Sequence, residues 1–396
     1  MNVPKIRYDN FTKEWEKVKL SSQASFLQGL TYTPNDVSND GTIVLRSSNI
    51  QNSMVDYNDI VRVNIIIPEK LKIKENDILM CVRNGSKSLV GKTAWLSKNE
   101  EKCTWGAFMN IIRPKEKNKF VYYYLNSKYF YNHVWKDLGT ATVNQITKQT
   151  LESCYLNIPS IEEQEKISNT LSLLDQKIKL QSKKIEDLKL FKKGLDIKIF
   201  NNKKLFDVGI IKEYFESDGG TALEKYIDEK GTYNIISIGN YTPDGRYYDN
   251  GQKVIYNEKT KMKLLSKNNL AMILNDKTTT GDIIGSTILI DEDNKYIYNQ
   301  RTQKLICKNI NAEYSWCFFN SKYFRDKVFR LSQGGTQIYV NYSQIENQKI
   351  FIPKNKKIEN DIVKSIFLIT KLIDNENDKF LKLQKLKKGL MQNMFV

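Results

Sequence analysis

The chain has 396 residues, of which 40% are hydrophobic and 11% aromatic, so it can bury real cores and wholesale disorder is disfavoured. Its 62 Lys and Arg residues exceed its 45 Asp and Glu residues and give a formal net charge of +17, which favours nucleic acid as partner over an acidic protein or a lipid surface. The five cysteines form no CxxC pair and no apolar run could span a bilayer, which argues against a zinc site, a disulfide framework and a membrane span. We therefore expect a soluble, cytoplasmic protein that binds no metal.

Residues 1–158 predict a first mixed α/β domain. An aromatic-rich helix near 119–135 follows its strands, and we expect the aromatic side chains of this helix to form core rather than a platform for stacked bases. The strand-like runs are 42–46, 77–82, 89–96 and 108–113.

One loop of this domain, residues 85–93, resembles a phosphate-binding P-loop. Five residues separate Gly85 from Gly91, whereas that loop requires four between its glycines. Residues 94–96 continue as a strand and not as a helix whose N-terminus could face a phosphate. A glycine turn between strands is therefore favoured over nucleotide binding.

A first long helix is predicted over residues 159–200. Ser160 and Glu163 form a capping-box pattern directly after Pro159. Apolar residues then recur at alternating spacings of three and four, which is typical of a coiled-coil seam, and only Gln181 and Lys192 interrupt it. The seam consists of Ile167, Leu171, Leu174, Ile178, Gln181, Ile185, Leu188, Lys192, Leu195 and Ile199.

Residues 201–352 repeat the first domain. The stretch NSKYF at 126–130 returns at 320–324, 194 residues later, and KKGL at 192–195 returns at 387–390. This period is too long for a solenoid, so it indicates the duplication of a whole domain. The β-rich parts of the two copies diverge, as expected of one scaffold that carries two different recognition surfaces. In the second copy the strand-like runs are 233–238, 269–274, 283–290 and 304–307, with a helix near 313–331.

A second long helix is predicted over residues 353–396. Its seam is interrupted at Glu376 and Lys387, the positions that correspond to Gln181 and Lys192. We predict that the two helices pair antiparallel as a coiled coil and that these four polar positions set its register. The alternative is that each helix packs only on its own domain. The full seam is Ile362, Ile366, Ile369, Ile373, Glu376, Phe380, Leu383, Lys387, Leu390 and Met394.

Antiparallel pairing makes two further predictions. Gln181 should lie beside Phe380, and Ile185 beside Glu376. The second helix should also end near residues 1–20, which would bring Phe395 close to Trp15.

The sequence offers little catalytic chemistry. It contains a single histidine, His133, which is expected to be structural, and without paired cysteines this disfavours histidine triads and zinc catalysis. Pro243 and Asp244, with residues 293–295, match a nuclease pattern only loosely, and the first domain has no equivalent. We therefore predict no catalytic residue.

Polar and basic loops remain, and their side chains suit nucleic acid. Arg and Lys can bind guanine edges, and Asn and Gln can bind adenine edges, although the same residues also contact phosphate or water. In the first domain these loops include residues 83–87 and the stretch Val143, Asn144 and Gln145. The candidate DNA-binding residues are Arg83, Asn84, Ser86, Lys87, Asn144 and Gln145 in the first domain, and Arg246, Tyr247, Asn275, Lys277, Thr278, Thr336, Gln337 and Tyr339 in the second.

This layout resembles the specificity subunit of type I restriction-modification systems, over nearly the whole chain. The resemblance rests on the stretch NIPSIEEQEKI at 157–167 opening a long helix, on KKGL with Phe200, and on PKIRY at 4–8 with Trp15. The second copy, at Ile352, Pro353 and 387–395, lacks the SIEEQ segment, which leaves the start of its helix open.

The resemblance implies a non-catalytic subunit. It implies two target recognition domains that each read one half of a split, asymmetric site in double-stranded DNA, with helices that fix the unread spacer. It also implies two methyltransferase subunits, which bind S-adenosylmethionine, and restriction motor-nuclease subunits, which use ATP and Mg²⁺; this chain itself would bind no cofactor.

Two other readings stay open. One is a coiled-coil adapter that binds protein and has no sequence preference on DNA. The other is a stand-alone nuclease or nucleotide hydrolase, which would require turnover by the purified chain without partners.

Overall fold

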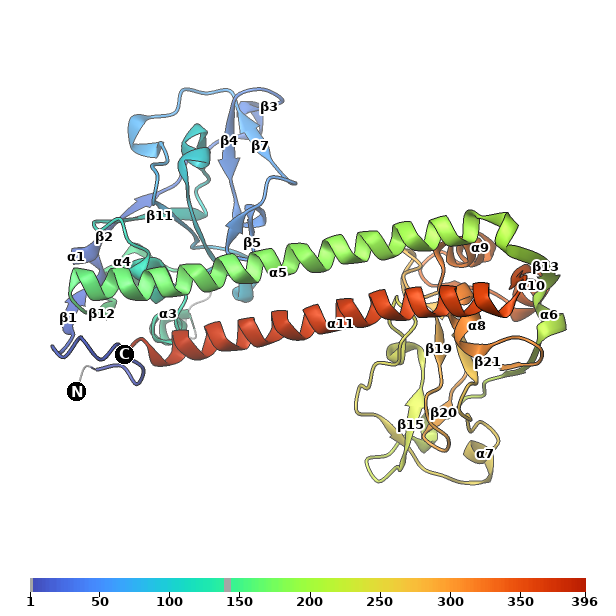
Figure 1. Ribbon diagram of the computed structural model, residues 1–396. Coiled ribbons are helices and arrows are strands. Elements are labelled where there is room, and N and C mark those ends of the chain that lie inside the picture. Colours follow the sequence, from blue (N-terminus) through green and yellow to red (C-terminus); the bar gives the residue numbers. More distant parts are fainter. Residues whose placement is uncertain (1–2, 139–143) are drawn as a thin grey trace. The chain divides into compact units, whose positions relative to one another are not determined.

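The computed structural model describes residues 3–138 and 144–396, and it divides into two compact units (Figure 1). Unit 1 comprises Met1–Ser182 and Asp378–Val396, and unit 2 comprises Lys183–Asn377. Each unit therefore holds one globular part and a portion of both long helices. The domain boundaries predicted after residues 158, 200 and 352 stay a prediction.

Unit 1 is a mixed α/β domain. Its elements are β1 (Glu16–Lys19), α1 (Leu20–Gln23), β2 (Ala24–Gln28), β3 (Val37–Ser38), β4 (Thr42–Leu45), β5 (Ile50–Gln51), β6 (Met54–Val55), β7 (Val61–Val63), β8 (Ile78–Cys81), β9 (Thr93–Trp95), β10 (Cys103–Trp105), β11 (Met109–Pro114), α2 (Phe120–Leu125), α3 (Lys128–Leu138), α4 (Lys148–Ser153), β12 (Tyr155–Ile158), and parts of α5 (Ile161–Asn201) and α11 (Lys356–Asn393).

Two four-stranded sheets form the β-rich part of unit 1. One is antiparallel, in the order β2-β11-β8-β9, and the other has the order β10-β4-β7-β3 with β10 parallel to β4. Side chains of β8 alternate between two cores, as the two-residue period of a strand requires: Ile78 and Met80 face one, Leu79 and Cys81 the other. All four are fully buried because both faces of this sheet are covered.

Unit 2 repeats this plan. Its elements are the end of α5, β13 (Phe206–Ile210), α6 (Ile211–Tyr214), β14 (Phe215–Gly219), β15 (Tyr233–Ile236), β16 (Lys253–Val254), α7 (Glu258–Lys261), β17 (Leu270–Ile273), β18 (Asn275–Asp276), β19 (Thr287–Leu289), β20 (Tyr296–Tyr298), β21 (Thr302–Cys307), α8 (Ala312–Phe319), α9 (Lys322–Leu331), β22 (Ile338–Tyr339), α10 (Tyr342–Glu346), β23 (Lys349–Pro353) and the first part of α11.

The sheets of unit 2 correspond to those of unit 1. The order β14-β21-β17-β19 matches β2-β11-β8-β9, and the pair β13-β23 matches β1-β12. Strand β17 again divides its side chains between two cores, with Leu270 and Met272 in one and Ala271 and Ile273 in the other. The predicted duplication of a mixed α/β domain is confirmed.

The single helix predicted over 119–135 is wrong, because the chain forms two helices with a break at NSKYF. The amide of Asn126 donates to the Tyr122 carbonyl at the end of α2 (2.8 Å) and to Thr93 on β9 (2.7 Å). The Phe130 backbone N–H donates to the Ser127 hydroxyl, across the first turn of α3 (3.5 Å).

The helix predicted over 313–331 is divided in the same way. Asn320 donates to the carbonyls of Trp316 (2.9 Å) and Thr287 (2.8 Å), and Ser321 caps α9 by accepting from the Phe324 N–H (3.2 Å). Phe130 and Phe324 are both fully buried. NSKYF therefore forms the corner between two helices in both units. Its asparagine bonds to the sheet, its serine caps the next helix, and its phenylalanine is buried in the core.

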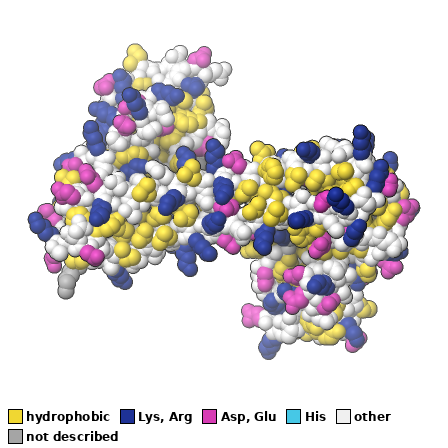
Figure 2. Space-filling model, viewed as in Figure 1, with side chains coloured by type: hydrophobic (Ala, Val, Ile, Leu, Met, Phe, Trp, Pro, Cys, Tyr) yellow, Lys and Arg dark blue, Asp and Glu magenta, His cyan; other side chains and the backbone are white. Residues whose placement is uncertain are grey.

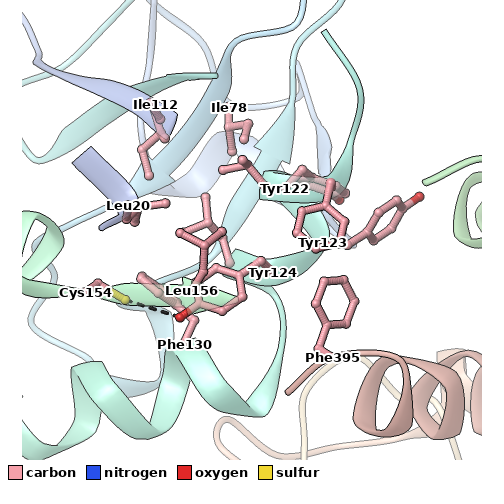
Figure 3. Packing of buried hydrophobic residues seen from close by; sticks show 14 of the residues in the cluster. Leu20, Ile78, Ile112, Tyr122, Tyr123, Tyr124, Phe130, Cys154, Leu156 and Phe395 are labelled. Carbon is pink, nitrogen blue, oxygen red and sulfur yellow. Dashed lines mark hydrogen bonds between the residues drawn. The ribbon is translucent and has the colours of Figure 1, made fainter. Parts of the chain in front are cut away.

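The prediction that the second long helix ends near residues 1–20 is confirmed inside unit 1. The backbone N–H of Ile6 donates to the Asn393 carbonyl (3.0 Å). The Phe120 ring lies 5.7 Å from Trp15 and 5.2 Å from Phe395, so both flank one aromatic side chain. Figure 3 shows Phe395 pointing from the chain end toward the buried aromatics of α2.

The two long helices are confirmed, and they run antiparallel within each unit. In unit 1, Lys387 of α11 pairs with Asp175 of α5 (2.5 Å). Met394, directly after the end of α11, lies in the same core as Ile167, which precedes Asp175 on α5. In unit 2, Lys184 pairs with Glu376 (3.0 Å). The start of α11, left open by the sequence, lies at Lys356.

The predicted seam is also confirmed by burial. Each of its twenty positions is buried or half-buried, although both helices carry exposed residues around them. Glu376 pairs with Lys184, the neighbour of Ile185, and the contact of Glu376 with Ile185 itself stays a prediction. The contact of Gln181 with Phe380 stays a prediction.

Candidate nucleic-acid interface

In unit 1 the structure brings all six predicted DNA-binding residues together. Four of them lie on residues 82–91, the first polar loop, which follows β8. Arg83 forms an antiparallel bridge with Gln145, the Asn84 N–H donates to the Asn144 carbonyl (3.3 Å), and the Asn144 amide donates to the Gly85 carbonyl (3.0 Å). Two segments distant in sequence thus form one polar surface. Val143 lies outside the described residues.

Two exposed aromatic residues, which sequence analysis missed, hold the cations of this loop. The Arg83 guanidinium lies 5.1 Å from the centre of the Phe108 ring, and the Lys87 ammonium 4.6 Å from that of Trp135. The rings are 57% and 42% exposed, so these cation–π contacts orient the charges while they remain accessible. The sequence signals a role for Trp135 only through the alignment of the repeats, in which an aromatic residue, Phe329, occupies the corresponding position.

The loop also organises itself internally. The Asn84 amide donates to the Ser47 hydroxyl (3.0 Å) and accepts from the Ser86 N–H (2.9 Å), while the hydroxyls of Ser86 and Ser88 lie 2.9 Å apart. The Asn84 amide thus already bonds within the loop, whereas the side chains of Arg83 and Gln145 are exposed to solvent. The P-loop reading fails here, because residues 93–95 form β9 as expected.

The second polar loop, residues 274–285 of unit 2, has the same surroundings. Strand β18 pairs with β22, so Asn275 faces Tyr339, and the Val340 N–H donates to the Leu274 carbonyl (2.9 Å). In unit 1 the equivalent bond joins Ile146 to Val82 (2.7 Å). The same scaffold thus presents different side chains in each unit.

A buried carboxylate, Asp276, shapes the second polar loop. It accepts from the N–H and hydroxyl of Thr278 (both 2.9 Å) and from the Ile283 N–H (2.8 Å). Asp276 is 3% exposed, whereas Lys277 and Thr278 are exposed. The carboxylate folds the loop back on itself and leaves its polar tip in solvent.

Thr336 and Gln337 lie at an exposed hairpin tip beside this loop. Gln333 and Tyr339 exchange backbone hydrogen bonds, both 2.8 Å long, which close the hairpin. Gly334 has a φ of +118°, and a Cβ atom there would lie 2.0 Å from the Gln337 carbonyl oxygen, so only glycine fits. Six of the eight predicted residues of unit 2 thus gather on β18, the second polar loop and this hairpin.

Arg246 and Tyr247 are placed differently from the other predicted residues of unit 2. The Arg246 guanidinium pairs with Asp374 of α11 (2.5 Å) and with Asp244. The Tyr247 ring packs edge-on against Tyr296, with centroids 5.0 Å apart. Both side chains are half-buried on a turn next to the polar loop, and Arg246 joins this turn to the long helix.

The polar seam positions contact more than the opposite helix. Lys387, besides pairing with Asp175, lies over the Tyr123 ring (5.8 Å), and Lys192 lies over the Trp316 ring (5.9 Å). Burial lowers the pKa of Lys192. These lysines therefore anchor the helices to the globular part of each unit, whereas Glu376, only 6% exposed, pairs with the opposite helix.

The described residues hold no group of three or more His, Cys, Asp or Glu side chains that could bind a metal ion. His133 lies on α3 with its Nε2 3.3 Å from the Thr150 carbonyl, a structural position. Burial raises the pKa of the Cys81 thiol to about 11, which disfavours the thiolate. Nor does any helix in the described ranges have the length and apolar character of a membrane span.

Comparison with known proteins places these two units in a family. Residues 12–190 and 203–385 each match the family model of the "Type I restriction modification DNA specificity domain". The chain is 28% identical over 181 residues to the StySPI specificity subunit of Salmonella potsdam, and 29% identical over 167 residues to the EcoKI specificity subunit of Escherichia coli. These alignments cover 44% and 40% of this chain, but only 39% and 36% of those two relatives.

A longer alignment relates the chain to the MjaVIII specificity subunit of Methanocaldococcus jannaschii, at 26% identity over 82% of this chain and 80% of the relative. Among solved structures, the type I restriction-modification S subunit from M. genitalium superposes with a TM-score of 0.60 and 16% identity, covering 100% of this chain and 99% of that one. A second chain, from a study of complex assembly in a type I system, also gives 0.60, at 11% identity, covering 97% and 98% of the two chains. At this identity the likeness shows a shared fold.

Proposed function

Because the chain belongs to the family of type I restriction modification DNA specificity domains, we propose that it is the DNA-specificity subunit of a type I restriction-modification complex. Each unit reads one half of a split, asymmetric sequence in double-stranded DNA. The observation that carries this proposal is that the polar loop of each unit pairs with a second segment in the same way, but the side chains at these positions differ between the units. Arg83 and Gln145 occupy them in unit 1, and Asn275 and Tyr339 in unit 2.

The chemistry of these side chains fits base recognition. Arg and Lys suit the guanine edge, and Asn and Gln the adenine edge, so the two units present different hydrogen-bonding patterns to the major groove. Lysines such as Lys87 and Lys277 supply phosphate contacts, which position the protein without reading sequence. The net charge of +17 favours this approach to DNA.

The long helices support a second part of the proposal, a scaffold for two methyltransferase subunits. In both units they expose large apolar side chains that a soluble helix face does not need, as the hydrophobic areas in Figure 2 illustrate. Because the chain has two similar units and two methyltransferase subunits are proposed, we propose that each unit binds one of them. Exposed residues include Leu173, Leu180, Leu381 and Leu386 in unit 1, and Leu190, Phe191, Leu368 and Leu372 in unit 2.

In this assembly the chemistry belongs to the partners. The methyltransferase subunits bind S-adenosylmethionine and methylate adenine, and restriction subunits use ATP and Mg²⁺ to translocate and cut DNA. The chain described here supplies sequence recognition without catalysis, in the cytoplasm. The helices, at about 1.5 Å per residue, have the length to set an unread spacer between half-sites.

Genome-wide mapping of N6-methyladenine tests the proposal. The chain is expressed with the methyltransferase subunit encoded beside it, and a strain that lacks the chain is the control. A split motif that is methylated only when the chain is present is the expected result. A stable complex without new methylation would instead support the adapter, and DNA cleavage or nucleotide hydrolysis by the purified chain alone would support an enzyme.

A further inference from the structure

The helix after each NSKYF corner holds the polar loop of its unit. In unit 2, Gly281 and Gly285 of the second polar loop pack so closely on Phe329 and Val328 that an added Cβ atom would lie 2.3 Å and 2.9 Å from those side chains. Both glycines have a φ of +72°. The loop is therefore pressed against α9, and its shape depends on that helix.

Arg325, one turn earlier on α9, holds this loop through its backbone. Its Nε donates to the Ile284 carbonyl (2.8 Å) and one Nη to the Asp282 carbonyl (2.8 Å). Its other Nη donates to the Pro243 carbonyl (3.1 Å). Burial lowers the pKa of Arg325 to about 10, while Asp276 and Asp282 oppose this change, so the side chain is charged at neutral pH.

The planar fork of a guanidinium suits this task because it directs several N–H groups at once. Arg325 thus joins the second polar loop to the turn at Pro243. Arg246, on that same turn, pairs with Asp374 of α11. A continuous set of contacts leads from the exposed loop to the long helix inside unit 2.

Unit 1 has a different side chain at the same place. The position equivalent to Arg325 is Tyr131, 194 residues earlier, and its hydroxyl donates to the Gly91 carbonyl at the end of the first polar loop (3.3 Å). Gly91 also has a positive φ, of +88°, and the Tyr131 ring lies 3.2 Å from a Cβ placed there. Trp135, the equivalent of Phe329, contacts Lys87 of the same loop.

We propose that Arg325 and Tyr131 are positioning residues that fix the shape of their polar loops and thereby decide which bases each unit accepts. This inference rests on the proposed function of the loops. Neither side chain needs to touch DNA, since each acts through the backbone of a loop that does. Because each residue serves one unit, their effects on the two half-sites must be separate.

The test uses the chain coexpressed with its methyltransferase subunit. Wild type, Arg325→Lys and Tyr131→Phe are compared by the rate of adenine methylation on the cognate site and on every single-base variant of both half-sites. Arg325→Lys keeps the charge but cannot reach three carbonyls in a plane, and Tyr131→Phe removes only the hydroxyl. Lys322→Arg, an exposed substitution on α9, is the matched control.

We expect Arg325→Lys to lose about tenfold to a hundredfold in discrimination at the half-site of unit 2 and to leave the other half-site unchanged. Tyr131→Phe should show the converse, and thermal unfolding should show that both variants are folded. Unchanged discrimination in both variants, or an equal loss at both half-sites, would overturn the inference. Wild type without a split motif would instead overturn the proposed function, so the two failures are distinct.

Discussion

At the scale of single residues, the repeated asparagine of NSKYF shows how one side chain can specify a corner. A helix end leaves carbonyl groups without intrahelical partners, and an amide that also reaches the neighbouring strand satisfies them while fixing the angle of the chain. Asn320 accepts from the Thr287 N–H (3.0 Å) and donates to the Thr287 and Trp316 carbonyls. The motif recurs because both units need this corner.

Asn320→Ala should therefore destabilise unit 2. Removing the amide leaves the buried backbone groups of Thr287 without their partner, and we expect a loss of roughly 1–3 kcal/mol in the free energy of unfolding. Chemical denaturation followed by circular dichroism measures it. Asn360→Ala, at an exposed position of α11, is the control and should change stability by less than about 0.5 kcal/mol. Equal effects of both substitutions would contradict this role of Asn320.

Asp196 on α5 should make the stability of unit 2 depend on pH. Its carboxylate accepts from the Lys322 N–H at the start of α9 (2.6 Å), yet burial raises its pKa to about 6. The folded state then binds a proton at Asp196 more tightly than the unfolded state does, so the contribution of this group to stability is fully present below pH 4 and is lost as pH rises through 6.

Asp196→Asn removes this dependence because an amide does not titrate. Relative to wild type, the variant should gain about 3 kcal/mol of stability at pH 7 and nothing at pH 4. Unfolding midpoints of both proteins, compared from pH 4 to 8, provide the measurement. Parallel curves over the whole range would show that Asp196 does not titrate differently in the folded state.

At the scale of elements, the helix pair combines an apolar seam with a few polar positions of distinct function. Glu376 pairs with Lys184 across the helices, whereas Lys192 and Lys387 lie over aromatic rings of the globular parts. Polar groups in an apolar seam weaken pairing but disfavour a shifted register, because a shift would bury a charge without its partner. We therefore predict that the polar seam positions set the register of the helix pair rather than add stability.

The variant Glu376→Leu tests whether this residue sets the register of the helix pair at the cost of stability. The substitution removes a buried carboxylate and leaves Lys184, whose side chain is 57% exposed, in solvent, so the free energy of unfolding should be unchanged or higher. The same variant should methylate sites with more than one spacer length. Lys371→Leu, which adds a leucine at an exposed position of α11, controls for added hydrophobicity. A single spacer length in Glu376→Leu would mean that other residues set the register.

At the scale of the whole molecule, the duplication gives each unit its own polar loop, its own portion of both long helices and its own exposed apolar residues. In unit 1 these residues include Leu180 and Leu381, which are 67% and 60% exposed, and in unit 2 Leu190 and Leu368, which are 68% and 56% exposed. A contiguous patch of such side chains is typical of a surface that binds another protein, and these residues are the candidates for it. The proposed partner is one methyltransferase subunit on each unit.

Charged substitutions among the exposed apolar residues of unit 1 should then remove one partner. We expect the double variant Leu180→Lys and Leu381→Lys to bind a single methyltransferase subunit where wild type binds two, because each buried ammonium would cost several kcal/mol. Native mass spectrometry of the coexpressed complex counts the subunits. Ala222→Lys, an exposed site outside the long helices, should retain both. Two bound subunits in the double variant would exclude Leu180 and Leu381 from the docking surface.

The sequence by itself determined the duplication, the two long helices and their seam, because these depend on periodic patterns that each residue shares with near neighbours. It also indicated most of the loop residues that gather in each unit, but Arg246, which pairs with Asp374, shows that a basic residue in a loop can serve a helix instead.

Only the tertiary structure decided what holds those loops. Phe108 and Trp135 meet Arg83 and Lys87, and Arg325 meets three carbonyls, through contacts between elements that are far apart in the chain. The break at NSKYF was missed for the same reason, since the helix period continues through it, while Asn126 reaches Thr93 on β9 only once the sheet lies beside it. Local periodicity determines where helices and strands form, whereas the packing of elements that are distant in the chain determines which partner each side chain contacts.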